Sequence, residues 1–264
     1  PCLMQPMPDA TAALQAAQAL LAQALQQPGG LCVMTGAGMS AESGIPTFRD
    51  ALTGYWSQFD PAELASVDGF RANPARVWRW YAERREGVRA ALPNAGHRAL
   101  AEFALRHPGV LNLVTQNVDD LHQRAGNTGV IRLHGDILDE RWLDTCPRQA
   151  RGGNVCDPQW AQPGAPPSCA ECGNLLRPGV VWFGEPLPLA AMDAAERAAT
   201  GCAVMLVVGT SGAVWPAAGL AGLARRHGAQ VLIVNPAESE IDDQAHLVLR
   251  GTAAGVLPAL LAPA

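Results

Sequence analysis

The chain has 264 residues, of which 48% are hydrophobic, and its formal net charge is −5. This length and apolar content suffice for one large α/β domain with a small satellite. The acidic balance offers no basic face for nucleic acid, and no apolar run is long enough to cross a bilayer, so neither a nucleic-acid partner nor a membrane partner is expected.

The first predicted element is a helix over residues 9–27, which is rich in Ala, Leu and Gln and ends at the Pro-Gly-Gly sequence of residues 28–30. A short apolar strand is predicted at 31–35, directly before a glycine-rich turn. Helical patterns follow over 61–92, and a second strand is predicted at 110–115. A strand that runs into a glycine turn is typical of a nucleotide-binding unit.

The second half of the chain begins with a third predicted strand at 130–133. Residues 141–178 are dense in Pro, Gly and Cys and lose regular apolar periodicity, which indicates a small inserted module. Apolar strands return at 180–183, 204–208 and 231–234. Strands that alternate with helical spacers predict an α/β fold with a doubly wound, parallel (Rossmann-like) sheet.

The predicted organisation is a single domain over residues 1–264 with two insertions into its sheet-forming part. The Rossmann-like large part is expected to take in about residues 10–50, 95–140 and 180–260. A helical segment is expected at about 51–94 and the small cysteine-containing module at about 141–178.

A glycine-rich motif follows the first predicted strand. Residues 36–41, Gly-Ala-Gly-Met-Ser-Ala, fit the G-x-G-x-x-G/A form, in which backbone N–H groups approach a pyrophosphate. Alone the signal is weak, because a plain glycine turn explains it equally well. The continuation Ser-Gly-Ile-Pro-Thr-Phe-Arg at 43–49 is unusual for an ordinary dehydrogenase.

Four of the seven cysteines lie close together in the sequence: Cys146, Cys156, Cys169 and Cys172. In a chain with no recognisable secretory signal, such a cluster is more typical of a metal site than of disulfides. Cys169-x-x-Cys172 is one half of a zinc knuckle, and a site of four thiolates would be structural because it leaves no open position. A module held by packing alone is the alternative.

The basic residues are all arginine, 19 in number, and Ala, Gly and Pro are frequent. This bias is typical of a GC-rich bacterial genome. Because no signal peptide is recognisable, we expect a cytoplasmic protein, and we expect a monomer. A chain without lysine cannot itself be acylated on a side chain, apart from its N-terminus.

Six segments resemble, in chain order, the signatures of the sirtuin family. They are residues 36–50, 115–126, 132–135, 181–185, 209–216 and 234–236, and the resemblance spans about residues 15–260. It implies an enzyme that consumes NAD to remove acyl groups from lysine side chains. His134, which follows a predicted strand and would otherwise be interpreted as structural, is identified as the catalytic base.

The resemblance also implies a mechanism. The amide oxygen of acyl-lysine attacks C1′ of the nicotinamide ribose as nicotinamide leaves. Neutral His134 acts as general base on a ribose hydroxyl, which suits an imidazole whose pKa lies near the working pH. Asn117, the second catalytic residue, orients the cosubstrate. The products are free lysine, nicotinamide and 2′-O-acyl-ADP-ribose.

Further NAD contacts are implied in the same way. Asp119 would contact nicotinamide and Gln116 the ribose, while Phe48 would cover the reacting face and Arg49 would face the ribose and phosphates. The full set of expected NAD-binding residues is Gly36, Ala37, Gly38, Ser40, Phe48, Arg49, Gln116, Asn117, Asp119, Gly209, Thr210, Ser211, Asn235 and Ala253.

Tyr81 and Arg84 lie at positions i and i+3 of a predicted helix, so they share one face. A phenol and a guanidinium together form a receptor for a carboxylate. Their spacing resembles the desuccinylase and demalonylase branch of sirtuins, which implies succinyl, malonyl or glutaryl lysine as substrate and acetyl-lysine as a weaker one. Ala51 would leave room in this pocket. A solvated arginine on an ordinary helical face is the alternative.

The acylated lysine of another protein is the expected partner, bound as an added peptide strand. The residues expected to contact that peptide are Val181, Phe183, Gly184, Glu185 and Val214.

One departure from the family concerns the cysteines. A second C-x-x-C usually completes the sirtuin zinc site, but this chain has Trp142 and Thr145 at the corresponding places. Cys146 and Cys156 are therefore the expected partners of the knuckle, and one structural zinc is expected.

Other functions remain open from the sequence. They are a deacetylase without acidic preference, an ADP-ribosyl transferase or NAD hydrolase, an NAD-binding sensor and a Rossmann dehydrogenase. The sensor is disfavoured because it need not keep the base His134.

Overall fold

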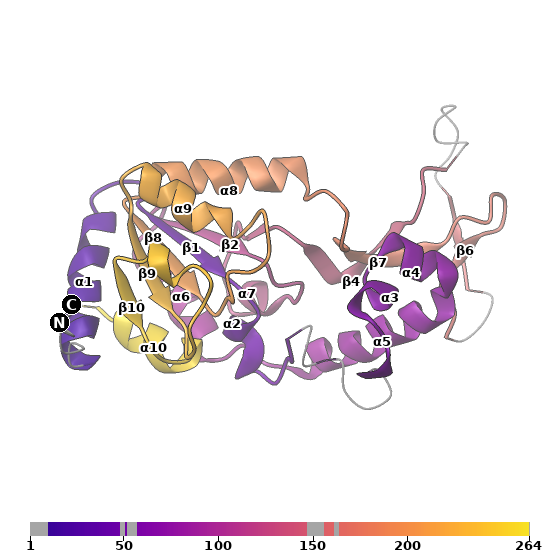
Figure 1. The fold of residues 1–264 in the computed structure, drawn as a ribbon, viewed down its shortest axis with the longest axis horizontal. Helices are drawn as coiled ribbons and strands as arrows, with labels where there is room; N and C mark the ends of the chain where they lie inside the picture. Colours follow the sequence, from indigo (N-terminus) through magenta and orange to yellow (C-terminus); the bar gives the residue numbers. More distant parts are fainter. Residues whose placement is uncertain (1–9, 48–50, 52–56, 147–155, 161–163, 264) are drawn as a thin grey trace, which may run out of the picture.

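The computed structural model of the chain describes residues 10–47, 51, 57–146, 156–160 and 164–263. Figure 1 shows a sheet-containing region that holds both ends of the chain, and a second region built from α3, α4, α5 and short strands. None of the described helices is long and apolar enough to span a bilayer.

The first region is built on a six-stranded sheet in the order β10-β9-β8-β1-β2-β3, and every pairing in it is parallel. Its strands are β1 (Leu31–Thr35), β2 (Leu111–Thr115), β3 (Ile131–Arg132), β8 (Val204–Val208), β9 (Gln230–Val234) and β10 (Leu247–Leu249). The chain leaves β1 toward β2 on one side and returns to β8 on the other. The predicted doubly wound parallel sheet is therefore confirmed, and its topological switch point lies between β1 and β8.

Helices cover both faces of this sheet, which explains why β1 and β8 are buried along their whole length and are apolar except for Thr35 at the end of β1. One face packs against α1 (Ala10–Ala24), α6 (Ala95–Arg106) and α10 (Ala253–Leu260). The other packs against α8 (Leu189–Gly201) and α9 (Gly219–Arg226), which run along the top of Figure 1. Short helices α2 (Gly38–Ala41), α7 (Leu121–Arg124) and η3 (Asp242–Gln244) lie in the connections.

The second region packs three helices on a two-stranded antiparallel sheet. The helices are α3 (Pro61–Leu64), α4 (Val67–Ala72) and α5 (Pro74–Ala90), and the strands are β4 (Gly135–Trp142) and β7 (Leu176–Val180). An aromatic core that includes Phe70, Trp80, Tyr81 and Trp182 joins them. A further antiparallel pair, β5 (Pro158–Gln159) and β6 (Ser168–Cys169), holds the cysteine module.

Among the described residues, one strand prediction was displaced and four strands were missed. The run predicted as a strand at 180–183 lies just after β7, which ends at Val180 and pairs with β4 outside the parallel sheet. Beyond Val180 the backbone makes isolated hydrogen bonds instead of a continuous strand ladder. Val181 N–H donates to the His134 carbonyl (2.8 Å), and Phe183 N–H donates to the Ala65 carbonyl (2.9 Å). The strands β4, β5, β6 and β10 were not predicted.

Candidate active site

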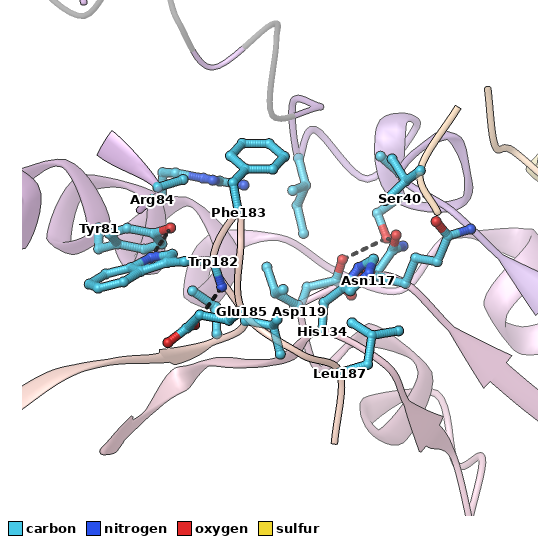
Figure 2. A pocket seen from close by; sticks show the side chains of 18 of the residues that line it. Ser40, Tyr81, Arg84, Asn117, Asp119, His134, Trp182, Phe183, Glu185 and Leu187 are labelled. Carbon is cyan, nitrogen blue, oxygen red and sulfur yellow. Dashed lines mark hydrogen bonds between the residues drawn. The ribbon is translucent and has the colours of Figure 1, made fainter. Parts of the chain in front are cut away.

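A cavity of about 290 Å³ opens beyond the carboxyl ends of β1 and β2, where the two regions meet. Figure 2 shows that its lining side chains come from both regions, with Ser40, Asn117, Asp119 and His134 on one side and Tyr81, Arg84 and Trp182 on the other. We call these two sides the base half and the acyl half. The position agrees with the rule that open α/β sheets bind ligands outside the carboxyl ends of their strands.

The glycine turn after β1 lies directly against the Gly209-Thr210 turn after β8. Gly38 N–H donates to the Gly209 carbonyl at 2.8 Å. A Cβ on Gly38 would lie 2.8 Å from the Gly209 Cα, and one on Gly36 would lie 2.8 Å from the Gly209 oxygen. Only glycine fits at both positions, so the backbone is exposed for the close approach that a pyrophosphate needs.

Other residues predicted to bind NAD surround this double turn. Asn235 donates from Nδ2 to the Thr210 carbonyl (3.4 Å), and Gln116 donates from Nε2 to the Thr210 hydroxyl (3.3 Å). Ser211 follows in the same turn, and its carbonyl accepts from Glu240 N–H (2.9 Å). Ala253, at the start of α10, is buried where that helix packs near α2.

The lining of the cavity itself includes only part of the predicted NAD set. Ala37, Ser40, Gln116, Asn117 and Asp119 line it, whereas the glycines and the other members of the double turn lie beside it. Phe48 and Arg49 lie outside the residues that the structure describes.

Ser40 is the centre of the polar network in the base half. Its Oγ accepts from Asn117 Nδ2 at 3.1 Å and donates to Asp119 Oδ2 at 2.9 Å, as the dashed lines of Figure 2 show. The other carboxylate oxygen of Asp119 accepts from Leu121 N–H at 3.1 Å. Burial raises the pKa of Asp119, and these hydrogen bonds oppose the rise.

His134 lies at the junction of β3 and β4. Its Nδ1 is 2.8 Å from the Gln116 carbonyl oxygen, and because a carbonyl only accepts, Nδ1 must carry the proton. Neutral His134 therefore presents Nε2 as its proton-accepting nitrogen. Burial lowers the pKa of His134, so the ring is neutral at physiological pH, as a general base requires.

Tyr81 and Arg84 are brought together in the acyl half by one face of α5. The indole N–H of Trp182 donates to the Tyr81 hydroxyl at 2.9 Å. Burial raises the pKa of Tyr81 to about 12, so the phenol remains protonated. Burial also lowers the pKa of Arg84, but a guanidinium remains charged in proteins.

Trp182 was not singled out from the sequence, although it lies inside the segment 181–185. Glu185 accepts from its backbone N–H (2.8 Å), and the Arg177 guanidinium lies 3.4 Å from the centre of its ring. Arg177 is fully buried and pairs with Glu185 (2.5 Å). The sequence did offer one signal for Trp182, since its indole N–H is a hydrogen-bond donor within a segment already predicted to contact the substrate.

The residues predicted to contact a peptide all line the cavity. Val181, Phe183, Gly184 and Glu185 come from the segment after β7, and Val214 comes from the connection between β8 and α9. Phe183 is 56% exposed and Val214 42%, so both present apolar surface at the cavity. Glu185 differs from the rest, because its carboxylate is already held by Arg177, Arg141 and Trp182 N–H. Ala51 packs against the aromatic core and is not among the residues that line the cavity.

The sulfur atoms of three of the four cysteines, Cys146, Cys156 and Cys172, lie within 4.8 Å of one another despite their irregular spacing. The Cys172 sulfur lies 3.8 Å from that of Cys146 and 3.5 Å from that of Cys156, and Cys169 belongs to the same buried cluster. These separations exceed a disulfide bond of about 2.05 Å. They match the edge of roughly 3.8 Å that follows for a tetrahedron with Zn–S bonds of about 2.3 Å. The donor set therefore fits one zinc ion.

The fold and the cavity together are those of the class of α/β proteins that bind a nucleotide at the switch point of a parallel sheet, and a neutral histidine whose Nε2 can accept a proton lies in the cavity. The sequence model of the Sir2 family matches residues 36–216 of this chain. The chain therefore belongs to the Sir2 family, and its recognition as a sirtuin from the sequence is confirmed.

Known proteins agree with this assignment. The chain is 56% identical over 230 residues to an NAD-dependent protein deacylase of Ralstonia nicotianae, covering 87% of this chain and 90% of that protein. It resembles the crystal structure of a Sir2 homolog–NAD complex with a TM-score of 0.78 and 43% identity, covering 91% of each chain. It also resembles Sir2Tm bound to a propionylated peptide, with a TM-score of 0.72, 30% identity, and coverage of 90% and 94%.

Proposed function

We propose that this chain is an NAD-dependent protein lysine deacylase that prefers acidic acyl groups, such as succinyl, malonyl or glutaryl, over acetyl. Family membership and a relative named as an NAD-dependent protein deacylase support the general activity. The acidic preference is supported by one observation above all, the hydrogen bond from Trp182 to the Tyr81 hydroxyl beside Arg84.

NAD fits the site because Gly36 and Gly38 pack closely against Gly209. A Cβ at either position would collide with Gly209, so only backbone faces the ligand there. The double turn around Gly36, Gly38 and Thr210 would hold its phosphates and adenosine ribose. When bound, NAD supplies a ribose whose nicotinamide departs and which then accepts the acyl group. A structure titled as a Sir2 homolog–NAD complex, similar to this chain along most of its length, supports this binding mode.

The base half supplies the chemistry of this chain. His134 Nε2 would take the proton of a ribose hydroxyl, while its Nδ1–H remains on the Gln116 carbonyl. Asn117 and Asp119, fixed through Ser40, would orient the nicotinamide end of NAD. Because these side chains already bond one another, little reorganisation is needed when the reaction starts.

The acyl half supplies the selectivity. The Trp182 indole N–H can only donate, so it occupies a lone pair of the Tyr81 oxygen and turns that hydroxyl into a donor toward the cavity. Arg84 adds a positive charge on the same helical face. A carboxylate only accepts hydrogen bonds, and a charge-assisted contact of this kind is worth roughly 1.5–3 kcal/mol.

A substrate peptide would bind as an added strand between the 181–185 segment and the segment that holds Val214. Phe183, Gly184 and Val214 would contact it, and main-chain bonds would supply affinity with weak dependence on sequence. Because the chain contains no lysine, the acyl-lysine must come from another molecule. The similar Sir2Tm structure is titled as bound to a propionylated peptide, which supports this part of the proposal.

The cysteine cluster would hold one zinc ion in a structural role. Cys146, Cys156 and Cys172 lie close enough together to share one ion, and Cys169 of the same buried cluster would be the fourth ligand. Four thiolates leave no coordination position for substrate.

The proposal is tested with one peptide sequence that carries acetyl-, malonyl-, succinyl- or glutaryl-lysine in turn. Free lysine peptide and nicotinamide are both measured in the presence and absence of NAD. We expect NAD-dependent, equimolar release of the two products, with the acidic acyl groups at least tenfold ahead of acetyl in kcat/KM, as about 1.4 kcal/mol or more of selective contact implies. Equal or faster removal of acetyl would leave a deacetylase without acidic preference.

A further inference from the structure

The peptide group between Gln116 and Asn117 is held at both of its polar ends. Its carbonyl oxygen accepts from His134 Nδ1 at 2.8 Å, and its N–H donates to the Thr115 hydroxyl at 3.0 Å. A peptide group is planar, so its C=O and N–H turn together. Whatever fixes the N–H therefore also fixes the direction of the carbonyl that meets the His134 ring.

The Thr115 hydroxyl is itself held in place by two further side chains. It is 2.8 Å from the hydroxyl of Thr35, and that hydroxyl is 3.0 Å from Nε2 of His122. All three side chains are almost completely buried. Burial and the neighbouring His97 ring lower the pKa of His122 to about 3, so this row of hydrogen bonds remains uncharged at physiological pH.

We propose that Thr115 is a positioning residue for His134, because its hydroxyl fixes the peptide plane whose carbonyl selects the Nδ1–H form of the ring. The role of His134 as base rests on the proposed function, but the hydrogen bonds do not. The Nδ1–H form leaves Nε2 free to accept a proton, so the wrong tautomer would remove the base without removing the residue.

The sheet itself does not depend on the Thr115 side chain. The backbone of Thr115 accepts from Leu133 N–H (2.9 Å), and Gln116 N–H donates to the Thr35 carbonyl (2.9 Å). These ladder bonds survive when the hydroxyl is replaced by a methyl group of the same shape. Without the hydroxyl, however, the buried Asn117 N–H loses its acceptor, and the peptide can turn to find another.

The test compares Thr115→Val with Thr115→Ser in the full chain. Val preserves the shape and removes the hydroxyl, whereas Ser preserves the hydroxyl and removes the methyl group. We measure kcat and the KM for NAD, and we record the ¹⁵N chemical shifts of the His134 ring, assigned by their loss in His134→Gln. Thermal unfolding of each variant reports whether it folds.

We expect Thr115→Val to lower kcat by about tenfold or more, since a small misplacement of a catalytic group costs this much. The KM for NAD should change far less, and the His134 shifts should move from the Nδ1–H pattern toward a mixture of tautomers. Thr115→Ser should restore the wild-type shifts and most of kcat. Thr35→Val, which leaves the acceptor of Asn117 N–H in place, should produce a smaller change in the same direction, and it serves as the test if Thr115→Val fails to fold.

Two results would overturn the proposal. One is an unchanged His134 tautomer in folded Thr115→Val, and the other is equal damage by Ser and Val, which would assign the effect to packing of the methyl group. The tautomer is read in the resting protein without turnover. If the wild type holds the Nδ1–H form and Thr115→Val loses it, but the wild type removes no acyl group, the result would therefore contradict the proposed function and not this inference.

Discussion

The base half and the acyl half of the cavity both present buried polar side chains, but they differ in where the hydrogen bonds of those side chains go. In the base half, Ser40, Asn117 and Asp119 bond one another, and His134 bonds a backbone carbonyl. In the acyl half, Trp182 donates to Tyr81, and among the described residues we find no acceptor for the Tyr81 proton.

In the proposed function, this difference separates chemistry from selectivity. A network that closes on itself keeps its geometry whatever acyl group enters, so it should serve every substrate alike. A donor without a protein acceptor gains its partner only when a substrate supplies one, so it should distinguish acidic acyl groups from acetyl. Changes in the base half should therefore lower all rates together, and changes in the acyl half should alter their ratio.

The largest effect is expected from His134→Ala. Loss of the general base should lower turnover by about 10²-fold or more. The loss should be similar for succinyl and acetyl peptides, because the base does not contact the acyl end. Nicotinamide release and deacylation are measured for both peptides, with thermal unfolding as the control for folding. A folded variant that keeps full activity would remove His134 from the mechanism.

A smaller effect, confined to acidic substrates, is expected from Tyr81→Phe. It removes one donated hydrogen bond and leaves the ring packing intact, so desuccinylation should fall by about 3- to 10-fold, the equivalent of roughly 0.7–1.4 kcal/mol. Deacetylation should change little. Equal losses for the two acyl groups would show that the Tyr81 hydroxyl does not distinguish between them.

A still smaller effect is expected from Trp182→Phe, which removes the indole N–H that orients the Tyr81 hydroxyl. Desuccinylation should fall by about threefold or less, because the hydroxyl can still donate once it rotates. The same substitution made in Tyr81→Phe should add nothing, since no hydroxyl remains to orient. Additive losses in this double-mutant cycle would mean that Trp182 acts through packing alone.

Changes in the cysteine module, which lies apart from both halves, should have the smallest effect on the succinyl-to-acetyl ratio of kcat/KM. Protein purified without added zinc should contain about one equivalent of the metal, as one four-thiolate site requires. Cys169→Ser should lower the unfolding temperature while the succinyl-to-acetyl ratio remains as in the wild type. A metal-free wild-type protein of unchanged stability would show that packing alone holds the module.

The parallel sheet could be predicted from the sequence because its central strands carry their own signal. β8 (Val204–Val208) was predicted to the residue, since a strand buried on both faces is an unbroken apolar run. By contrast, β4 is rich in charged residues and is half-exposed along much of its length. Its partner β7 contains Arg177, a buried arginine that no apolar pattern reveals.

The site was predictable only where its residues are close in the sequence or belong to recognisable motifs. Tyr81 and Arg84 share a helical turn, so their common face could be predicted. The Trp182–Tyr81 bond joins residues 101 positions apart, and no spacing rule links them. Likewise, the cysteine spacing could not show that Cys146 and Cys156 reach Cys172, because that depends on how the intervening chain folds.

The most direct test of the division between the two halves is the succinyl-to-acetyl ratio of kcat/KM in the wild type and in Arg84→Met. Methionine keeps much of the apolar bulk of the arginine stem and removes its charge. We expect the ratio to fall by about tenfold to a hundredfold, through loss of desuccinylation and with deacetylation unchanged or improved. A ratio that stays the same, whether both rates fall or neither does, would contradict the assignment of selectivity to the acyl half.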